Sequence, residues 1–258
     1  MQAHNQAALV SGAASGLGLA TAHALAKAGA RVAILDRNLD AAETAAAEIA
    51  ALGGAAIAVQ CDVGSAESAE RAVAEARQAH GPARILVSCA GIGTPGKIVG
   101  RDGPMKLEDF ARVINVNLVG TFNMMRLAAA DMKGLEPLET GERGVIVSTA
   151  SIAAYEGQIG QAAYASSKGG VAALTLPAAR EFSRSGIRVL AVAPGIFGTP
   201  MLFGLSDDVQ QALGASVPFP SRLGAPDEFA SLVMHMVDNV MMNGEVVRLD
   251  GALRMAPI

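Results

Sequence analysis

Aromatic residues and cysteines are scarce in this chain. Its 258 residues include no tryptophan, two tyrosines and two cysteines. The cysteines, Cys61 and Cys89, lie far apart and belong to no CxxC or Cys/His group. This spacing argues against a disulfide framework and against a zinc site, so we expect no bound metal.

Charge and long apolar runs are limited as well. Only 17% of the residues are charged, the formal net charge is −4, and the lysines and arginines form no cluster. A chain of this kind does not attract a phosphate backbone, so we expect no nucleic-acid partner. Apolar runs are broken by Gly, Pro or a charge before about 18 residues accumulate, which argues against a membrane-spanning helix. The first ten residues, MQAHNQAALV, lack a signal-peptide pattern, so we expect a cytoplasmic protein.

Short apolar segments instead alternate with longer alanine-rich ones. Seven segments predict β-strands: residues 7–11, 31–36, 55–60, 85–89, 144–148, 188–193 and 245–249. Most are apolar throughout, as strands covered on both faces must be. Helical patterns lie between them; one begins at Asp40 and stops at Gly53, and another stops at Gly81. The alternation predicts an α/β fold with a doubly wound parallel sheet in a single domain over residues 1–258.

Three connections are longer than the others: residues 93–105, 133–144 and 195–225. The third directly follows a predicted strand and is rich in proline and glycine. Ligands of open parallel sheets bind beyond the carboxyl ends of the strands. We therefore expect residues 195–225 to cover the substrate.

A glycine-rich segment, SGAASGLG, follows the first predicted strand and opens a helix. Its glycines are Gly12, Gly16 and Gly18. Glycine at these positions lets backbone N–H groups approach a pyrophosphate, and the helix N-terminus adds partial positive charge. The placement between strand and helix favours a dinucleotide site over an ordinary turn.

An acidic residue at the end of the second predicted strand indicates which nucleotide is bound. Asp36 is placed to accept hydrogen bonds from a ribose diol and to repel a 2′-phosphate, which favours NAD over NADP. The alternative for Asp36 is a turn or capping role. Arg37 is an argument in the other direction, because a guanidinium beside the ribose accommodates a phosphate.

Only one of the two tyrosines has a cation at helical spacing. Tyr164 and Lys168, four residues apart in a predicted helix, share a face, and a nearby ammonium lowers the pKa of a phenol. Tyr155 has Ile159 at that spacing, so we expect it to pack or to line the pocket. Ser151 is placed to offer a hydroxyl to the same substrate oxygen, and Asn117 to relay protons through water.

In order and spacing these features resemble the short-chain dehydrogenase/reductase family: Gly12-x-x-x-Gly16-x-Gly18, Cys89-Ala90-Gly91, Asn117, Ser151, Tyr164-x-x-x-Lys168 and Pro194-Gly195. The resemblance covers essentially the whole chain and implies a Rossmann-type sheet of seven strands. Tyr164 would then be the general base in alcohol oxidation, and Ser151 would hold the substrate oxygen. Lys168 would bind the nicotinamide ribose and depress the pKa of Tyr164, and Asn117 would hold a proton-relay water.

Longer matches are similar to the type II 3-hydroxyacyl-CoA dehydrogenases: TASIAAYEGQIGQAAYASSKGG, APGIFGTPML, VPFPSRLG and NGEVVRLDGALRM. Members of that family are NAD-dependent tetramers that act on short-chain and branched 3-hydroxyacyl-CoA, and in some cases on hydroxysteroids. This resemblance implies NAD as cofactor and an acyl-CoA substrate in fatty acid metabolism. The contacts that it implies are Ser15, Leu17, Asp62, Val63, Cys89, Ala90, Gly91, Phe197 and Thr199 for NAD, and Ser151, Gln161 and Tyr164 for the substrate.

The C-terminal tail is expected to take part in assembly. Leu253 and Met255 follow the last predicted strand, where an isolated monomer would leave apolar surface and a sheet edge near solvent. The resemblance implies a homotetramer in which this tail, with Arg254, reaches a neighbouring subunit near the substrate loop.

Three alternatives remain open. An NADPH-dependent 3-oxoacyl carrier-protein reductase would share the fold and the catalytic residues, but Asp36 argues against it. A dehydrogenase of hydroxysteroids or other secondary alcohols would share them too. A protein of another class, a binding or scaffold subunit with an incidental dehydrogenase site, is compatible with the same fold.

Overall fold

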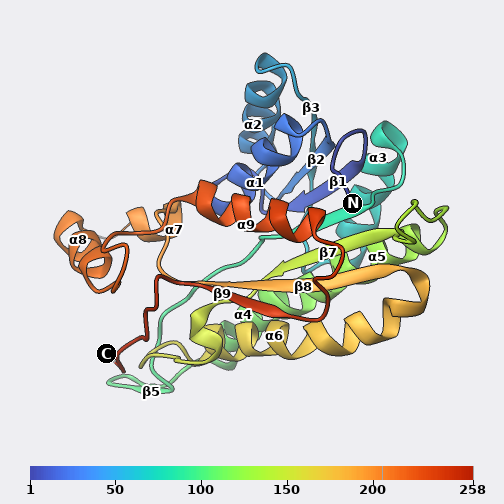
Figure 1. Cartoon of the computed structure of the whole chain (residues 1–258). Helices are drawn as coiled ribbons and strands as arrows, with labels where there is room; N and C mark the ends of the chain where they lie inside the picture. Colours follow the sequence, from blue (N-terminus) through green and yellow to red (C-terminus); the bar gives the residue numbers. More distant parts are fainter. Residues whose placement is uncertain (205, 258) are drawn as a thin grey trace.

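A sheet of seven parallel strands forms the centre of the computed structural model over the described residues, 1–204 and 206–257 (Figure 1). Leu205, which belongs to the expected substrate cover, and the terminal Ile258 lie outside them. The strand order is β3-β2-β1-β4-β7-β8-β9. The strands are β1 (Ala7–Ser11), β2 (Arg31–Asp36), β3 (Ala55–Gln60), β4 (Ile85–Ser88), β7 (Gly144–Thr149), β8 (Ile187–Pro194) and β9 (Val246–Leu249). The predicted α/β fold and all seven strands are confirmed, with ends that agree within one residue.

The strand order reverses next to β1. From β1 the chain builds β2 and β3 on one side and then crosses to β4 on the other, and every pairing in this sheet is parallel. Such a reversal leaves a crevice beyond the carboxyl ends of the strands, because the connections on its two sides cover opposite faces of the sheet.

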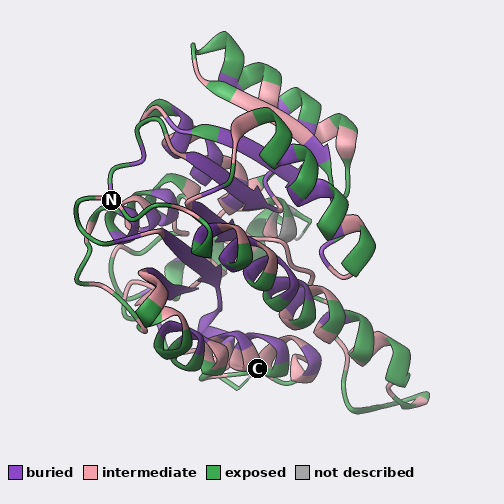
Figure 2. Ribbon diagram, turned by 90° about the vertical axis from the view of Figure 1, so that its right-hand side faces the viewer, coloured by how far each residue is buried: buried purple, intermediate pink, exposed green. Residues whose placement is uncertain are grey.

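Helices cover both faces of the sheet (Figure 1). One layer comprises α1 (Gly16–Lys27), α2 (Leu39–Ala51) and α9 (Pro226–Asp238), and the other α3 (Ala66–His80), α4 (Leu107–Ile114), α5 (Gly120–Lys133) and α6 (Ala162–Phe182). Buried residues are concentrated in the central strands and on the helix faces that cover them (Figure 2). The strands β1, β4, β7 and β8 are buried along their whole length, which explains their unbroken apolar sequences.

Helix α2 begins earlier than predicted. The expected start at Asp40 is wrong, because the Asn38 side chain caps the helix by accepting a hydrogen bond from the Ala41 N–H at 3.2 Å. Asp40 lies inside the first turn, where its negative charge interacts favourably with the partial positive charge of the helix N-terminus. The predicted stops are confirmed: Gly53 and Gly81, both with φ of 82°, follow α2 and α3.

A single π-helical turn, η1 (Asn115–Val119), joins α4 to α5. A turn of this kind holds one residue more than the regular α-helical ladder. It carries Asn117, which has no solvent exposure, and turns this side chain toward Ile92 on the loop after β4 and Ser167 on α6.

The long connections contain short elements of their own. Residues 93–105 form a hairpin of β5 (Val99–Gly100) and β6 (Gly103–Pro104). Residues 195–225 hold the helices α7 (Pro200–Phe203) and α8 (Asp207–Ala215). Two 3₁₀ turns, η2 (Ile152–Ala154) and η3 (Ser183–Ser185), flank α6. No helix of the described ranges is long and apolar enough to cross a membrane.

The connection over residues 133–144 brings a carboxylate into the protein. Glu142 and Arg188 of β8 form an ion pair of 2.6 Å, and both side chains are almost inaccessible, with 4% and 6% exposure. The same guanidinium donates to the carbonyl oxygens of Met236, Val237 and Met242, at and after the end of α9. It therefore joins the connection to the C-terminal part of the fold.

The C-terminal tail folds back onto its own chain. Leu253 is 5% exposed and belongs to a buried cluster with Ile152 and Val217. The expectation that an isolated monomer leaves this leucine in solvent is wrong, because the turn after β9 brings it under η2. Arg254 pairs with Asp250 and Glu156 of the same chain. The expected sheet edge is present, since among residues 1–204 and 206–257 β9 pairs only with β8.

Candidate active site

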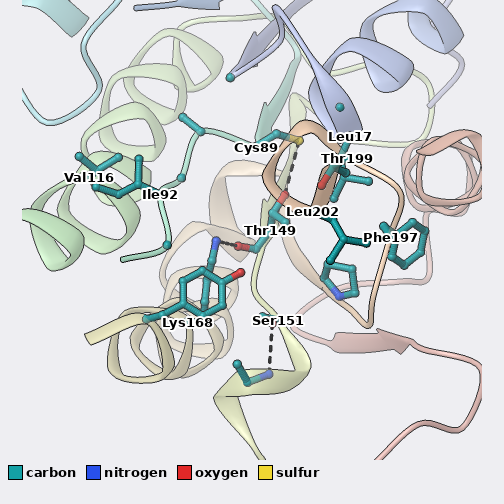
Figure 3. Close-up of a pocket in the computed structure, with 18 of the residues that line it drawn as sticks. Leu17, Cys89, Ile92, Val116, Thr149, Ser151, Lys168, Phe197, Thr199 and Leu202 are labelled. Carbon is teal, nitrogen blue, oxygen red and sulfur yellow. Dashed lines mark hydrogen bonds between the residues drawn. The ribbon is translucent and has the colours of Figure 1, made fainter. Parts of the chain in front are cut away.

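A cavity of about 770 Å³ lies where the carboxyl ends of the strands meet (Figure 3). Residues from the turns after β1, β3, β4, β7 and β8 contribute to its wall. The sequence-predicted residues that line it are Gly12, Ser15, Gly16, Leu17, Gly18, Asp36, Asp62, Val63, Cys89, Ala90, Gly91, Ser151, Gln161, Tyr164, Lys168, Phe197 and Thr199. Asn117 is not in the wall.

The glycine-rich turn between β1 and α1 is closely packed. Gly12 and Gly16 have φ of 67° and 57°. A Cβ on Gly12 would lie 2.6 Å from backbone atoms of Ala90, and one on Gly18 would overlap the carbonyl oxygen of Gly12. Ser15 precedes α1 without a side-chain cap, so the first N–H groups of this helix face the cavity without that partner. The turn therefore has the geometry of an anion site.

Asp36 braces this turn. One carboxylate oxygen accepts the Ala14 N–H at 3.1 Å and the other the Asn38 N–H at 3.0 Å. Asp36 thus has the turn role that the sequence analysis gave as its alternative. The residue also lines the cavity beside Arg37, so the contact to a ribose stays a prediction.

Lys168 of α6 is held deep in the site. Its ammonium donates to the Thr149 carbonyl oxygen at 2.7 Å, and the residue is 4% exposed (Figure 3). Burial lowers the pKa of Lys168 to about 8. The Thr149 hydroxyl donates to the Cys89 sulfur at 3.4 Å. Burial raises the pKa of this thiol to about 11, so Cys89 stays protonated at neutral pH and is no nucleophile.

Tyr164 lies beside Lys168 as the helical spacing predicts, with the ammonium nitrogen 5.7 Å from the ring centroid. The expected depression of its pKa is wrong for this structure. Burial raises the pKa of Tyr164, and a hydrogen bond with the Ser151 hydroxyl only partly opposes the rise. Lys168 does not lower the pKa of Tyr164 below its ordinary value, because the lysine ammonium donates its hydrogen bond to the Thr149 carbonyl oxygen.

Asn117 holds the loop after β4 in place through hydrogen bonds. Its amide exchanges two hydrogen bonds with the backbone of Ile92, at 2.8 and 2.9 Å, and donates to the Ser167 hydroxyl at 3.0 Å. A Cβ on Gly91 would lie 3.3 Å from the Asn117 oxygen and 3.5 Å from the Lys168 nitrogen. Asn117 thus fixes the loop next to Lys168, and its role in proton relay stays a prediction.

Tyr155 lies outside the cavity wall. It is 51% exposed, and the Arg248 guanidinium stacks over its ring at 5.3 Å. Tyr155 therefore packs against Arg248 and does not line the pocket, which were the two roles expected for it. The geometry favours Tyr164 over Tyr155 as the residue that acts on a substrate.

Some wall residues escaped the sequence analysis. Thr149 acts through its backbone carbonyl, which no side-chain pattern reveals. Gln158 lies inside a matched segment, where its spacing from Gln161 could have indicated a shared face of the loop. Met255 reaches the cavity only because the tail folds back, and no local signal predicts that path.

Comparison with known proteins identifies the family. The sequence profile described as short chain dehydrogenase matches residues 6–210. The chain belongs to the short-chain dehydrogenase family. This enzyme is therefore an oxidoreductase of a family that uses nicotinamide cofactors, and the predicted resemblance is confirmed.

Relatives of the enzyme agree over nearly its whole length. It is 50% identical over 252 residues to the 3-hydroxyacyl-CoA dehydrogenase type-2 of Bos taurus, covering 97% of this chain and 95% of that protein. The Drosophila melanogaster protein of the same name is 48% identical, with 98% and 99% covered. A crystal structure of 3-hydroxyacyl-CoA dehydrogenase type-2 from Mycobacterium avium superposes with a TM-score of 0.92 at 42% identity, with both chains fully covered.

Proposed function

We propose that this enzyme uses NAD to interconvert a 3-hydroxyacyl-CoA and a 3-oxoacyl-CoA, with a short or 2-methyl-branched acyl chain. The convergence of Ser151, Tyr164 and Lys168 in one cavity with the glycine-rich turn carries the proposal. It is supported by similarity to proteins named 3-hydroxyacyl-CoA dehydrogenase type-2.

The residues present fit a dinucleotide. The glycine-rich turn and the N-terminus of α1, which has no side-chain cap, line the cavity and would hold a pyrophosphate, and Asp36 lines the same cavity. Leu17, Phe197 and Thr199 stand across the cavity from Lys168 (Figure 3), where they would enclose the cofactor. When bound, a nicotinamide supplies the acceptor or donor of the hydride.

The protein's own groups would handle the proton. The Ser151 and Tyr164 hydroxyls are hydrogen-bonded to each other in this structure, and the Ala153 N–H donates to the serine oxygen at 3.1 Å. A substrate oxygen placed between the two hydroxyls would receive both as hydrogen-bond donors. Tyr164 then gives its proton to a ketone in reduction and takes one from an alcohol in oxidation.

The protonation state of Lys168 should make the affinity for NAD depend on pH. Its pKa of about 8 lies below the ordinary lysine value, so the ammonium loses its proton as pH rises through about 8. If the charged form binds the nicotinamide ribose, the affinity for NAD should fall over that range. In Lys168→Met the affinity should be lower at neutral pH and independent of pH. Fluorescence titration with NADH at several pH values measures both, with Lys133→Met as a surface control. A pH dependence retained in Lys168→Met would contradict the assignment.

The acyl-CoA part of the proposal rests on the relatives and the pocket. Gln161 lies in the wall beside Tyr164, and residues 195–225 border the same cavity through Ile196, Leu202 and Leu213. We propose that this segment covers the acyl chain. The carrier-protein reductase and the hydroxysteroid alternatives would use the same hydroxyls, so substrate trials have to separate them.

A substrate panel tests the function. Steady-state kcat/KM should be highest for short 3-hydroxyacyl-CoA, such as 3-hydroxybutyryl-CoA or its 2-methyl form, with NAD. The panel should include longer acyl-CoAs, a hydroxysteroid and a 3-oxoacyl carrier protein with NADPH. No turnover of any acyl-CoA would refute the substrate class, and NADH binding without turnover of any substrate would favour the scaffold alternative.

Asp36→Ala tests the cofactor. Loss of the carboxylate removes repulsion of a 2′-phosphate, so the preference for NAD over NADP should narrow. The ratio of kcat/KM for the two cofactors measures this effect. Because Asp36 also holds Ala14, unfolding should be compared in parallel. A wild type that already prefers NADP would show that Arg37 decides the selectivity, and would favour the reductase alternative.

We propose a cytoplasmic homotetramer as the working form. Large apolar side chains are exposed on the α4–η1–α5 segment, namely Leu107, Val119 and Phe122, and β9 leaves a sheet edge. Closed symmetric association would cover both. Light scattering of the purified enzyme decides the oligomeric state.

A further inference from the structure

The C-terminal tail runs alongside the loop between Ser151 and Tyr164. The Ile159 N–H donates to the Pro257 carbonyl oxygen at 2.9 Å, and the Gln158 amide donates to that of Ala256 at 3.0 Å. Two backbone segments almost a hundred residues apart in the chain are thus joined next to the catalytic tyrosine.

An ion-pair cluster secures the start of this tail. Arg248 of β9 donates to both carboxylate oxygens of Glu156, at 2.8 and 3.0 Å. The same guanidinium also donates hydrogen bonds to Asp250 at 2.7 Å and to the Leu253 carbonyl oxygen at 3.0 Å. Both members of the pair are about three-quarters shielded from solvent, so the forked geometry is held more firmly than in an open surface pair. Glu156 also accepts the Met255 N–H at 3.4 Å.

These contacts hold Met255 in a fixed position. This residue lines the cavity that holds Ser151 and Tyr164, and it packs against the buried cluster around Leu253. An unbranched thioether chain adapts to apolar ligands. Met255 therefore presents an apolar, adaptable side chain to the cavity that also contains Ser151 and Tyr164.

We infer that the tail forms one wall of the acyl pocket of its own chain, that Glu156 and Arg248 latch it there, and that Met255 limits the acyl length. The inference rests on the proposed function and names the residue that sets its specificity. The contacts on which it rests lie within one chain, and the expected reach of the tail toward a neighbouring subunit stays a prediction.

Met255→Ala tests the wall. Shortening this side chain should raise the ratio of kcat/KM for octanoyl-length over butyryl-length 3-hydroxyacyl-CoA by at least about tenfold, since a few methylenes of pocket space carry that discrimination. The Kd for NADH should be unchanged, because the contacts of Met255 are with the cluster around Leu253 and with Glu156, not with the glycine-rich turn. An unaltered ratio would overturn the specificity role.

Glu156→Gln tests the latch without using substrate. Amide hydrogen exchange followed by mass spectrometry should accelerate in peptides that contain Ile159 and Met255, whose N–H groups bond across the contact. Glu70→Gln is a matched control, because Glu70 forms a similar 2.8 Å pair with Arg126 on the distant α3–α5 surface. In kinetics, Glu156→Gln should raise KM for acyl-CoA more than it lowers kcat.

The two tests separate the latch from the function. Exchange rates in Glu156→Gln that match those in Glu70→Gln would overturn the latch whatever the substrate. If the wild type turns over no acyl-CoA, the proposed function and the acyl-length role fail together, while the exchange measurement still decides whether Glu156 holds the tail.

Discussion

Tyr164→Phe is expected to lower kcat by a factor of about 10² to 10⁴, the usual effect of removing a general acid or base. The ring still packs beside Lys168, so the Kd for NADH should change little. Tyr155→Phe serves as the matched control, since Tyr155 stacks against Arg248 outside the cavity. A larger loss in the control would contradict the assignment of Tyr164.

The raised pKa of Tyr164 adds a direction to this prediction. Burial keeps the phenol protonated at neutral pH, where it is ready to donate a proton to a ketone. Oxidation of the alcohol needs the deprotonated form, so kcat/KM for oxidation should rise with pH while that for reduction should not. Pre-steady-state rates in both directions across pH would show it, and an identical pH dependence of the two would contradict it.

Arg188→Met is expected to cost about 3 kcal/mol of the free energy of unfolding, because it breaks a buried ion pair and leaves the Glu142 carboxylate with the N-terminal ammonium, 3.0 Å away, as its remaining cation. Natural domains have only about 5 to 15 kcal/mol in total, so expression should suffer visibly. The carbonyl oxygens of Met236, Val237 and Met242 near the end of α9 lose the guanidinium as a donor as well. Urea unfolding measures the loss.

An exposed pair provides the comparison for Arg188→Met. Arg126→Met breaks the pair with Glu70 on the surface and should cost at most about 1 kcal/mol. Burial acts to raise the pKa of Glu142, but hydrogen bonds led by Arg188 hold it below its usual value. The stabilisation is therefore present above the ordinary carboxyl pKa and is lost as pH falls through the lowered one. A loss in Arg188→Met no larger than in Arg126→Met would refute the argument.

Local patterns predicted most of this fold and the centre of the site. The four-residue spacing of Tyr164 and Lys168 fixes one helix face, and the glycine-rich turn follows from steric limits near a strand end. Three features depend on how distant segments meet: the bond from Lys168 to the Thr149 carbonyl, the raised pKa of Tyr164, and the path of the tail to Met255. The burial of a polar side chain and its choice of a backbone acceptor have no local sequence signature, so these features required the structure.

The π-helical turn has a consequence for changes in chain length. Deleting one residue within Asn115–Val119 would let the regular i to i−4 ladder run from α4 into α5, and so would favour the helix. Because the wider turn accommodates its extra residue locally, the same deletion would keep α4 and α5 in register but would change the directions of the side chains within the turn. Asn117 would then leave the backbone of Ile92. Natural variants that lack this extra residue should therefore have a more stable helix over α4 and α5 and a lower activity. In such variants a deletion, and not a substitution, would exchange activity for stability.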